Sequence, residues 1–315
     1  MSRQFPILKR PDPAALAARR MVAPFVYVAN AGDDTISKID TGTDKVIATM
    51  RSEPEPSALT VTPDSELLFS VSARHNTVSA YLVAADTLEG TVPVGRNPQG
   101  VLIVITPNGP RSYVVNAGSD DIWVLDESAE RVAIVPAERH PLAIAATPDG
   151  RHALVVNEHS DSVTVIDTAS NTVSGHVRVG DKPVAVAISA DGGRAYVVNH
   201  GCDDIAVLET VHYHVVGRIR TANGPRSIAL HPHKPVAYVA HGSHFVDVID
   251  LSSGARPTEI RVGDKPESVV LTPSGDHLYV ANRHDGTVSA IDTRAYKVTA
   301  TIKVGKDPTY LAVTP

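Results

Sequence analysis

Short apolar runs alternate with polar turns along almost the whole chain. In residues 183–220, a nearly continuous apolar run, Pro183–Ser189, is followed by a Gly-containing turn and a second apolar run that ends at Asn199. Two further runs follow, Ile205–Leu208 and His214–Ile219, and apolar and polar residues alternate in the last of them. Continuous apolar runs are typical of strands buried on both faces, and alternation is typical of a strand with one face in water. The segment therefore predicts four strands joined by tight turns.

The second of these strands recurs along the sequence. Most copies resemble Tyr196-Val-Val-Asn199, and the last residue of the motif lies at positions 30, 72, 116, 157, 199, 241 and 282. A fixed period of about 42 residues, built only from short strands and turns, is the signature of a propeller with one blade per repeat. We therefore predict an all-β fold, a seven-bladed β-propeller with four antiparallel strands in each blade.

The two ends of the repeat array predict how the ring closes. The array begins at a second strand, Phe25–Asn30, and it ends after a first strand, Pro308–Pro315. We expect the C-terminal strand to complete the blade that the N-terminal three strands open, because this pairing removes an exposed sheet edge. Residues 25–315 then form a single propeller domain, and residues 1–24 form a tail or strap outside the repeat.

Composition narrows the classes of partner. The chain has a net charge of -6 and no block of Lys or Arg, which argues against nucleic-acid binding. No apolar run is long enough to span a membrane, and we find no signal peptide. Cys202 is the single cysteine, so no intrachain disulfide exists. We expect a cytoplasmic monomer without nucleic-acid or membrane partners.

Several short motifs together resemble one known repeat family. Tyr-Val-x-Asn, the turn Thr147-Pro-Asp-Gly150, the run Val163 to Asp167 and the loop Val-Gly-x-x-Pro look like the YVTN-type β-propeller repeat, over residues 25–315. The resemblance implies that the first strand of each blade lies nearest the axis. It also implies a range of roles, from scaffolds and surface-layer modules to lactonase-like enzymes, and the repeat itself carries no catalytic motif.

Histidines concentrate in loops that should share one face of the propeller. In an antiparallel four-stranded blade, the loops after the second and fourth strands lie at the same end. The five residues that start at each motif's last position hold six of the 14 histidines: His75, His159, His200, His241, His244 and His284. His140 joins them from a fourth-strand exit loop, and Arg74, Glu158 and Arg283 are neighbours. Loops on a rigid scaffold are where binding residues gather.

These residues suggest a metal or acid–base site at the channel mouth. Imidazole is the commonest metal ligand, and a catalytic metal typically has three protein ligands. We expect His241 and Glu158 to be catalytic, and Arg74 or Arg283 to hold an anionic group. His75 and His244 are further ligand-binding candidates. A divalent metal would be bound by corresponding loops of consecutive blades, through His159, His200, His241 and His284. Streptogramin lyases are similar at the level of the fold and use His, Glu and a metal at one face.

His241 departs from the rule of its own repeat. Asn at this position fits a side-chain hydrogen bond to nearby backbone, and departures from a structural rule are expected where function lies. The alternative is that His241 caps the turn as Asn does. The other histidines have alternatives too, namely solvated loop residues or a polar pocket without metal.

Two functions remain open on these residues. One is a small-molecule enzyme of lyase or hydrolase type. The other is a non-catalytic scaffold that binds a protein or peptide partner on the same face. An enzyme should show a deep polar pocket on the axis, whereas a scaffold should show a broad surface with an apolar centre.

Overall fold

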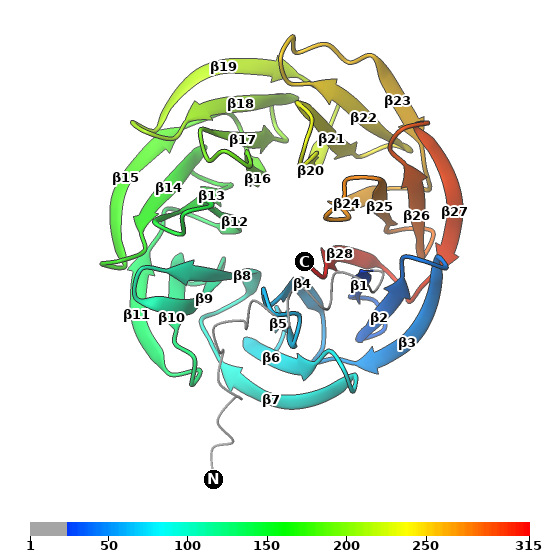
Figure 1. Cartoon of the computed structure of the whole chain (residues 1–315). Coiled ribbons are helices and arrows are strands. Elements are labelled where there is room, and N and C mark those ends of the chain that lie inside the picture. Colours follow the sequence, from blue (N-terminus) through cyan, green and yellow to red (C-terminus); the bar gives the residue numbers. More distant parts are fainter. Residues whose placement is uncertain (1–23) are drawn as a thin grey trace.

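The computed structural model describes residues 24–315, and these residues form 28 strands and no helix. The strands form seven separate four-stranded antiparallel sheets, which Figure 1 shows arranged as blades around one axis. The predicted seven-bladed propeller is confirmed. The segment before residue 24, for which a tail or strap is expected, lies outside the described residues. Within residues 24–315, no helix is long and apolar enough to cross a membrane.

Each blade has an innermost, a second, a third and an outermost strand (Figure 1). From blade 1 to blade 7, the innermost strands are β28 (Pro308–Val313), β4 (Pro56–Val61), β8 (Pro98–Thr106), β12 (Pro141–Ala146), β16 (Pro183–Ile188), β20 (Pro225–Leu230) and β24 (Pro266–Leu271). The second strands are β1 (Phe25–Asn30), β5 (Leu67–Ser72), β9 (Gly109–Asn116), β13 (His152–Asn157), β17 (Arg194–Asn199), β21 (Val236–His241) and β25 (His277–Asn282).

The outer half of each blade completes the sheet. The third strands are β2 (Thr35–Asp40), β6 (Thr77–Leu82), β10 (Asp121–Leu125), β14 (Ser162–Asp167), β18 (Asp204–Glu209), β22 (Phe245–Asp250) and β26 (Thr287–Asp292). The outermost strands are β3 (Lys45–Arg51), β7 (Thr87–Pro93), β11 (Arg131–Pro136), β15 (Thr172–Arg178), β19 (His214–Arg220), β23 (Thr258–Arg261) and β27 (Lys297–Lys303).

The burial of each strand follows its place in the blade. Second strands such as β5 are buried along their whole length, whereas in the outermost strand β15 every second residue is exposed. The tyrosines of five second strands pack in apolar clusters that span two neighbouring blades: Tyr27, Tyr113, Tyr196, Tyr238 and Tyr279. Two of them also hydrogen-bond across the blade boundary: Tyr113 Oη lies 2.8 Å from Asn171 of blade 4, and Tyr279 Oη lies 2.7 Å from Asp44 of blade 1.

The ring closes as the ends of the repeat array predict. β28 pairs antiparallel with β1, so blade 1 combines the last strand of the chain with the first three. The junction extends past the strand ends, because Thr314 N donates to Phe25 O at 3.0 Å and Phe25 N donates to Thr314 Oγ1 at 2.9 Å. The closing strand is held by backbone pairing and by apolar packing together.

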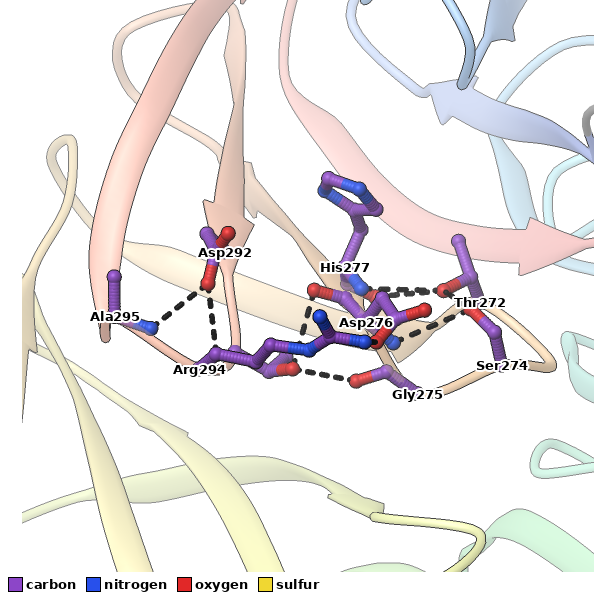
Figure 2. Close-up of polar contacts among 9 residues, drawn as sticks. Thr272, Ser274, Gly275, Asp276, His277, Asp292, Arg294 and Ala295 are labelled. Carbon is purple, nitrogen blue, oxygen red and sulfur yellow. Dashed lines mark hydrogen bonds and ion pairs between the residues drawn. The ribbon is translucent and has the colours of Figure 1, made fainter.

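The turns on the face opposite the His-rich loops follow one hydrogen-bonding scheme. In blade 7, Thr272 Oγ1 accepts from His277 N at 3.2 Å, and Thr293 Oγ1 donates to Gly275 O at 2.6 Å (Figure 2). Gly275 has a φ of 75°, which an L side chain rarely adopts. In blade 4 the equivalent Thr147 donates to Asp149 at 2.6 Å, and this bond holds the pKa of Asp149 below its usual value. The repeated Thr-Pro turn is thus a structural feature.

The Asn that recurs at the end of most second strands links the second strand to the third through side-chain hydrogen bonds, an arrangement called here the Asn–Ser clip. Asn30 Nδ2 donates to Ser37 Oγ at 3.0 Å, and Asn282 Nδ2 donates to Ser289 Oγ at 2.9 Å. Both asparagines are fully buried. The expected bond to nearby backbone is also present, since Gly263 N donates to Asn282 Oδ1 at 3.1 Å and Asn116 Nδ2 donates to Val114 O at 3.3 Å. The bond to a hydroxyl on the neighbouring strand is an additional contact of the buried amide.

Closure through β28 makes a testable contribution to stability. Leu311, on β28, is 4% exposed and packs among apolar residues of blades 1 and 7. We expect Leu311→Ala to lower the free energy of unfolding by about 3 kcal/mol, because it leaves a cavity in a packed core. The control Leu88→Ala removes a side chain that is 50% exposed on the outermost strand β7. This variant should change the free energy of unfolding by less than about 0.5 kcal/mol. Equal losses in urea titrations would contradict the role of β28.

Candidate functional site

A cavity of about 910 Å³ opens on the axis at the face that carries the His-rich loops. Seven of its lining residues share one structural origin, because each follows the proline that starts an innermost strand. At this residue the pairing with the second strand skips one position, so a β-bulge occurs in every blade. A bulge re-aims the side chain of the unpaired residue. The seven residues, here called the mouth ring, are Ser57, Gln99, Leu142, Val184, Arg226, Glu267 and Thr309.

The mouth ring contains one ion pair. Arg226 Nη1 of blade 6 lies 3.1 Å from Glu267 Oε1 of blade 7, with side chains 32% and 19% exposed. The residues two positions further along the innermost strands are apolar, and Ile144, Val186 and Ile228 are among those that line the cavity. The cavity therefore has a partly charged mouth above an apolar interior.

Glu158 both lines the cavity and contacts two histidines. It lines the cavity from the loop after β13, and its Oε2 lies 2.9 Å from His140 Nδ1 and 3.5 Å from His159 Nε2. The two imidazoles stack on each other, with ring centroids 4.3 Å apart and an interplanar angle of 15°. His140 has a φ of 55° in a turn after β11, which aims its ring towards the neighbouring loop. Glu158 is 22% exposed, so this carboxylate is partly shielded from bulk water.

The four expected metal ligands are not brought together. In residues 24–315, the one group of three or more His, Cys, Asp or Glu with ligand atoms within 4.8 Å of one another is His140, Glu158 and His159. His159 alone of the expected set belongs to it. His200 Nδ1 instead contacts Pro225 O at 3.0 Å, because its loop packs against the start of the next innermost strand.

The remaining predicted site residues lie around the mouth. Arg74 and Arg283 line the cavity, and Arg283 Nε lies 3.8 Å from Asp307 Oδ1. His244 and His284 both contact Asp264, at 3.7 Å and 3.2 Å, and both are about half exposed. 

His75 makes a separate surface pair. Its Nδ1 lies 2.8 Å from Glu53 Oε2, and the His75 side chain is 50% exposed. Neither residue is among those that line the cavity.

His241 is buried and does not belong to the described cavity lining. It is 3% exposed, and its Nε2 lies 3.3 Å from Oδ1 of Asp247, which is 1% exposed. Val239 pairs with Asp247 as Val28 pairs with Ser37, so Asp247 occupies the position of the serine in the Asn–Ser clip. The pair His241–Asp247 thus replaces an Asn–Ser pair, and a change at one position is matched by a change at the other.

The environment of Asp247 favours its charged form. Burial alone would raise its pKa, but contacts from His241 and from the Ala222 N–H, with the positive charge of Arg256, hold the pKa below its usual value. A buried carboxylate with these partners is a structural clip, because no atom of the pair reaches the cavity wall.

Sequence analysis did not single out Arg226 and Glu267. Both directly follow the repeated proline, and the repeated loop before the first strand is visible in the sequence. The signal that could have found them is the residue after each of these prolines, which varies from charged to apolar while its surroundings repeat.

Comparisons with known proteins extend the fold assignment. No protein-family model matches the chain, and no curated protein sequence matches it. The structure is similar to that of a Desulfotomaculum acetoxidans protein of unknown function, with a TM-score of 0.82 and 16% identity over 92% of this chain and 98% of that one. Kuenenia stuttgartiensis hydrazine synthase gives a TM-score of 0.76 and 20% identity over 84% of this chain and 90% of that one.

A further similar structure is that of a Bacteroides fragilis protein named as a candidate 6-phosphogluconolactonase. Its TM-score is 0.76, with 18% identity over 93% of this chain and 98% of that one. At these identities the similarity establishes the fold. The seven-bladed architecture implied by the YVTN resemblance is confirmed, and membership of that family stays a prediction.

The clip role of His241 predicts a compensating double variant. His241→Ala should lower the free energy of unfolding by about 3 kcal/mol, because it leaves the buried Asp247 carboxylate short of a partner. His241→Asn combined with Asp247→Ser rebuilds the clip of blades 1 and 7 and should stay within about 1 kcal/mol of the parent. Urea unfolding measures both. A double variant as unstable as His241→Ala would show that the pair is not a substitute for the clip.

Proposed function

We propose that this protein is a small-molecule enzyme of lyase or hydrolase type, with its substrate in the axial cavity. The observation that supports this most is the position of Glu158, a cavity-lining carboxylate that two imidazoles contact within 3.5 Å. Titratable side chains that meet at a partly enclosed cavity are the usual form of an acid–base site. The non-catalytic scaffold receives less support, because polar and charged side chains make up most of the mouth of an axial cavity, whereas a docking surface should be broad with an apolar centre.

Glu158, His140 and His159 supply the groups for proton transfer. Glu158 faces the cavity, so its carboxylate reaches a substrate proton directly. His140 and His159 contact this carboxylate, and imidazole is a common general acid or base in enzymes. In this arrangement, without a metal ion, Glu158 takes the proton from the substrate, and a neutral imidazole of His140 or His159 accepts that proton from Glu158 and releases it to water.

The same three residues fit a divalent metal ion. Two histidines and one carboxylate are a common catalytic zinc set, and bonds of about 2.0 Å place neighbouring ligand atoms about 3.3 Å apart. The contacts of 2.9 Å and 3.5 Å bracket that spacing. His140 Nδ1 is buried and makes no hydrogen bond of good geometry, so it has a lone pair or an N–H available for a further partner. Because the two rings are stacked, one of them would turn for both imidazoles to hold the same ion.

A bound ion would polarise a substrate oxygen or activate a water molecule. Glu158, His140 and His159 would hold it at the rim, while Arg74 and Arg283, which also line the cavity, are available for an anionic substrate group. Metal binding and substrate binding thus use neighbouring but separate residues.

Glu158→Gln tests this proposal, because the change keeps the size of the side chain and removes its charge and its basicity. We expect it to lower turnover about 100-fold or more and to abolish retention of Zn²⁺ or Mn²⁺. The assays are metal content after equilibrium dialysis and hydrolysis or elimination on a panel of aryl esters and lactones.

Glu209→Gln is a matched control. Glu209 also contacts two histidines, His212 and His214 at 3.4 Å each, but it lies at the end of β18 and is not part of the described cavity lining. This variant should behave like the parent protein. Equal turnover in the parent and in Glu158→Gln would refute the catalytic role of Glu158. A cavity without any turnover on the panel would favour the binding scaffold.

A further inference from the structure

The mouth ring is divided into an apolar and a polar sector. Leu142 and Val184, from the adjacent blades 4 and 5, are its two apolar members, and Ile144 and Val186 continue the apolar wall deeper into the cavity. The other five blades contribute polar or charged side chains to the ring. A cavity of about 910 Å³ with an apolar interior and an apolar sector in its mouth ring is of the size and kind that takes a small amphipathic molecule.

Arg226 is the basic residue of the polar sector. Its Nη1 contacts Glu267 at 3.1 Å, and this contact orients the guanidinium in the ring. A guanidinium carries five N–H donors, so one ion pair leaves donors for a second carboxylate. At 32% exposure, the Arg226 side chain is still accessible from the cavity.

The charges of the lining disfavour a doubly charged anion more strongly than a singly charged one. Five acidic residues line the cavity against three basic ones: Asp34, Glu55, Glu158, Glu267 and Asp307 against Arg74, Arg226 and Arg283. A doubly charged anion would meet more repulsion than attraction at this mouth. One carboxylate, in contrast, is matched by one oriented guanidinium.

From these features we infer that the axial cavity binds an apolar monocarboxylate, with its carboxylate on Arg226 and its alkyl or aryl body against Leu142 and Val184. Glu267 is a positioning residue for Arg226. The inference rests on the proposed function in that it uses the same cavity. The inference places the carbon skeleton of the ligand against the apolar sector of the mouth ring, part of which belongs to blade 4, the blade that also carries Glu158.

Calorimetric titration of the full chain in the presence of EDTA tests the inference without any need for turnover. The probes are phenylacetate, its uncharged analogue phenylacetamide, the cation phenethylamine, the dianion phenylsuccinate, and acetate, which lacks the apolar body. Phenylacetate should bind most tightly. Arg226→Gln should weaken phenylacetate binding about tenfold, and Val184→Asn about fivefold.

Two further variants guard against misfolding and unspecific charge effects. Arg226→Gln combined with Glu267→Gln keeps a hydrogen-bonded pair in the ring and should lose phenylacetate binding as Arg226→Gln does. Arg261→Gln removes an exposed arginine on the outermost strand β23 and should bind phenylacetate like the parent. Circular dichroism checks that each variant is folded.

The outcomes separate this inference from the proposed function. Amine or amide binding as tight as that of phenylacetate, no phenylacetate binding at millimolar concentration, or equal affinities of Arg226→Gln and Arg261→Gln would each overturn the inference. Phenylacetate binding that depends on Arg226, in a protein without catalytic turnover, would uphold it while the enzyme proposal fails. Metal-dependent turnover that is confined to uncharged substrates would uphold the enzyme proposal and overturn the inference of a monocarboxylate ligand.

Discussion

The pairing of β28 with β1 is the contact on which the rest of the molecule depends. A blade is a twisted sheet that is apolar on both faces, so it is stable only between two neighbours. Blade 1 has such neighbours on both sides only because the last strand of the chain joins the first three. Once the ring is closed, every innermost strand is held at a defined distance from the axis. The loops at the mouth are then positioned by a rigid body and not by their own contacts.

A single backbone irregularity, repeated seven times, turns this rigid ring into a site. The bulge after each leading proline directs one side chain per blade into the cavity, from Thr309 of blade 1 to Glu267 of blade 7. Because the backbone supports any residue there, the chemistry of the mouth varies without a cost to the fold. The apolar pair Leu142 and Val184 and the charged pair Arg226 and Glu267 thus coexist in one ring.

The histidines of this protein serve unlike purposes although they occupy similar loops. His241 is buried against Asp247 and holds two strands together, whereas His159 stacks on His140 at the edge of the cavity. His244 and His284 share a surface carboxylate, that of Asp264. The difference lies in which way each side chain points. His241 faces Asp247 on the adjacent strand β22, whereas His159 and His284 face the loops that lead into the innermost strands of their own blades.

The sequence by itself determined the architecture: seven blades, four strands each, the closing strand and the face on which the histidines gather. This was possible because strand periodicity and turn residues are signals within short sequence segments. The motif recurs seven times, so copies that depart from it, such as those ending in Ser72 and His241, do not obscure the pattern. Only the tertiary structure decided which residues meet. Glu158 and His140 flank the paired ends of β12 and β13, where Glu158 N donates to His140 O at 3.0 Å, but only the folded loops bring Glu158 Oε2 to 2.9 Å from His140 Nδ1. Residues from corresponding loops of consecutive blades, such as His159 and His200, are not brought together, because each blade rotates its loops about the axis. Side-chain convergence is a property of three-dimensional packing, and no single repeat encodes it.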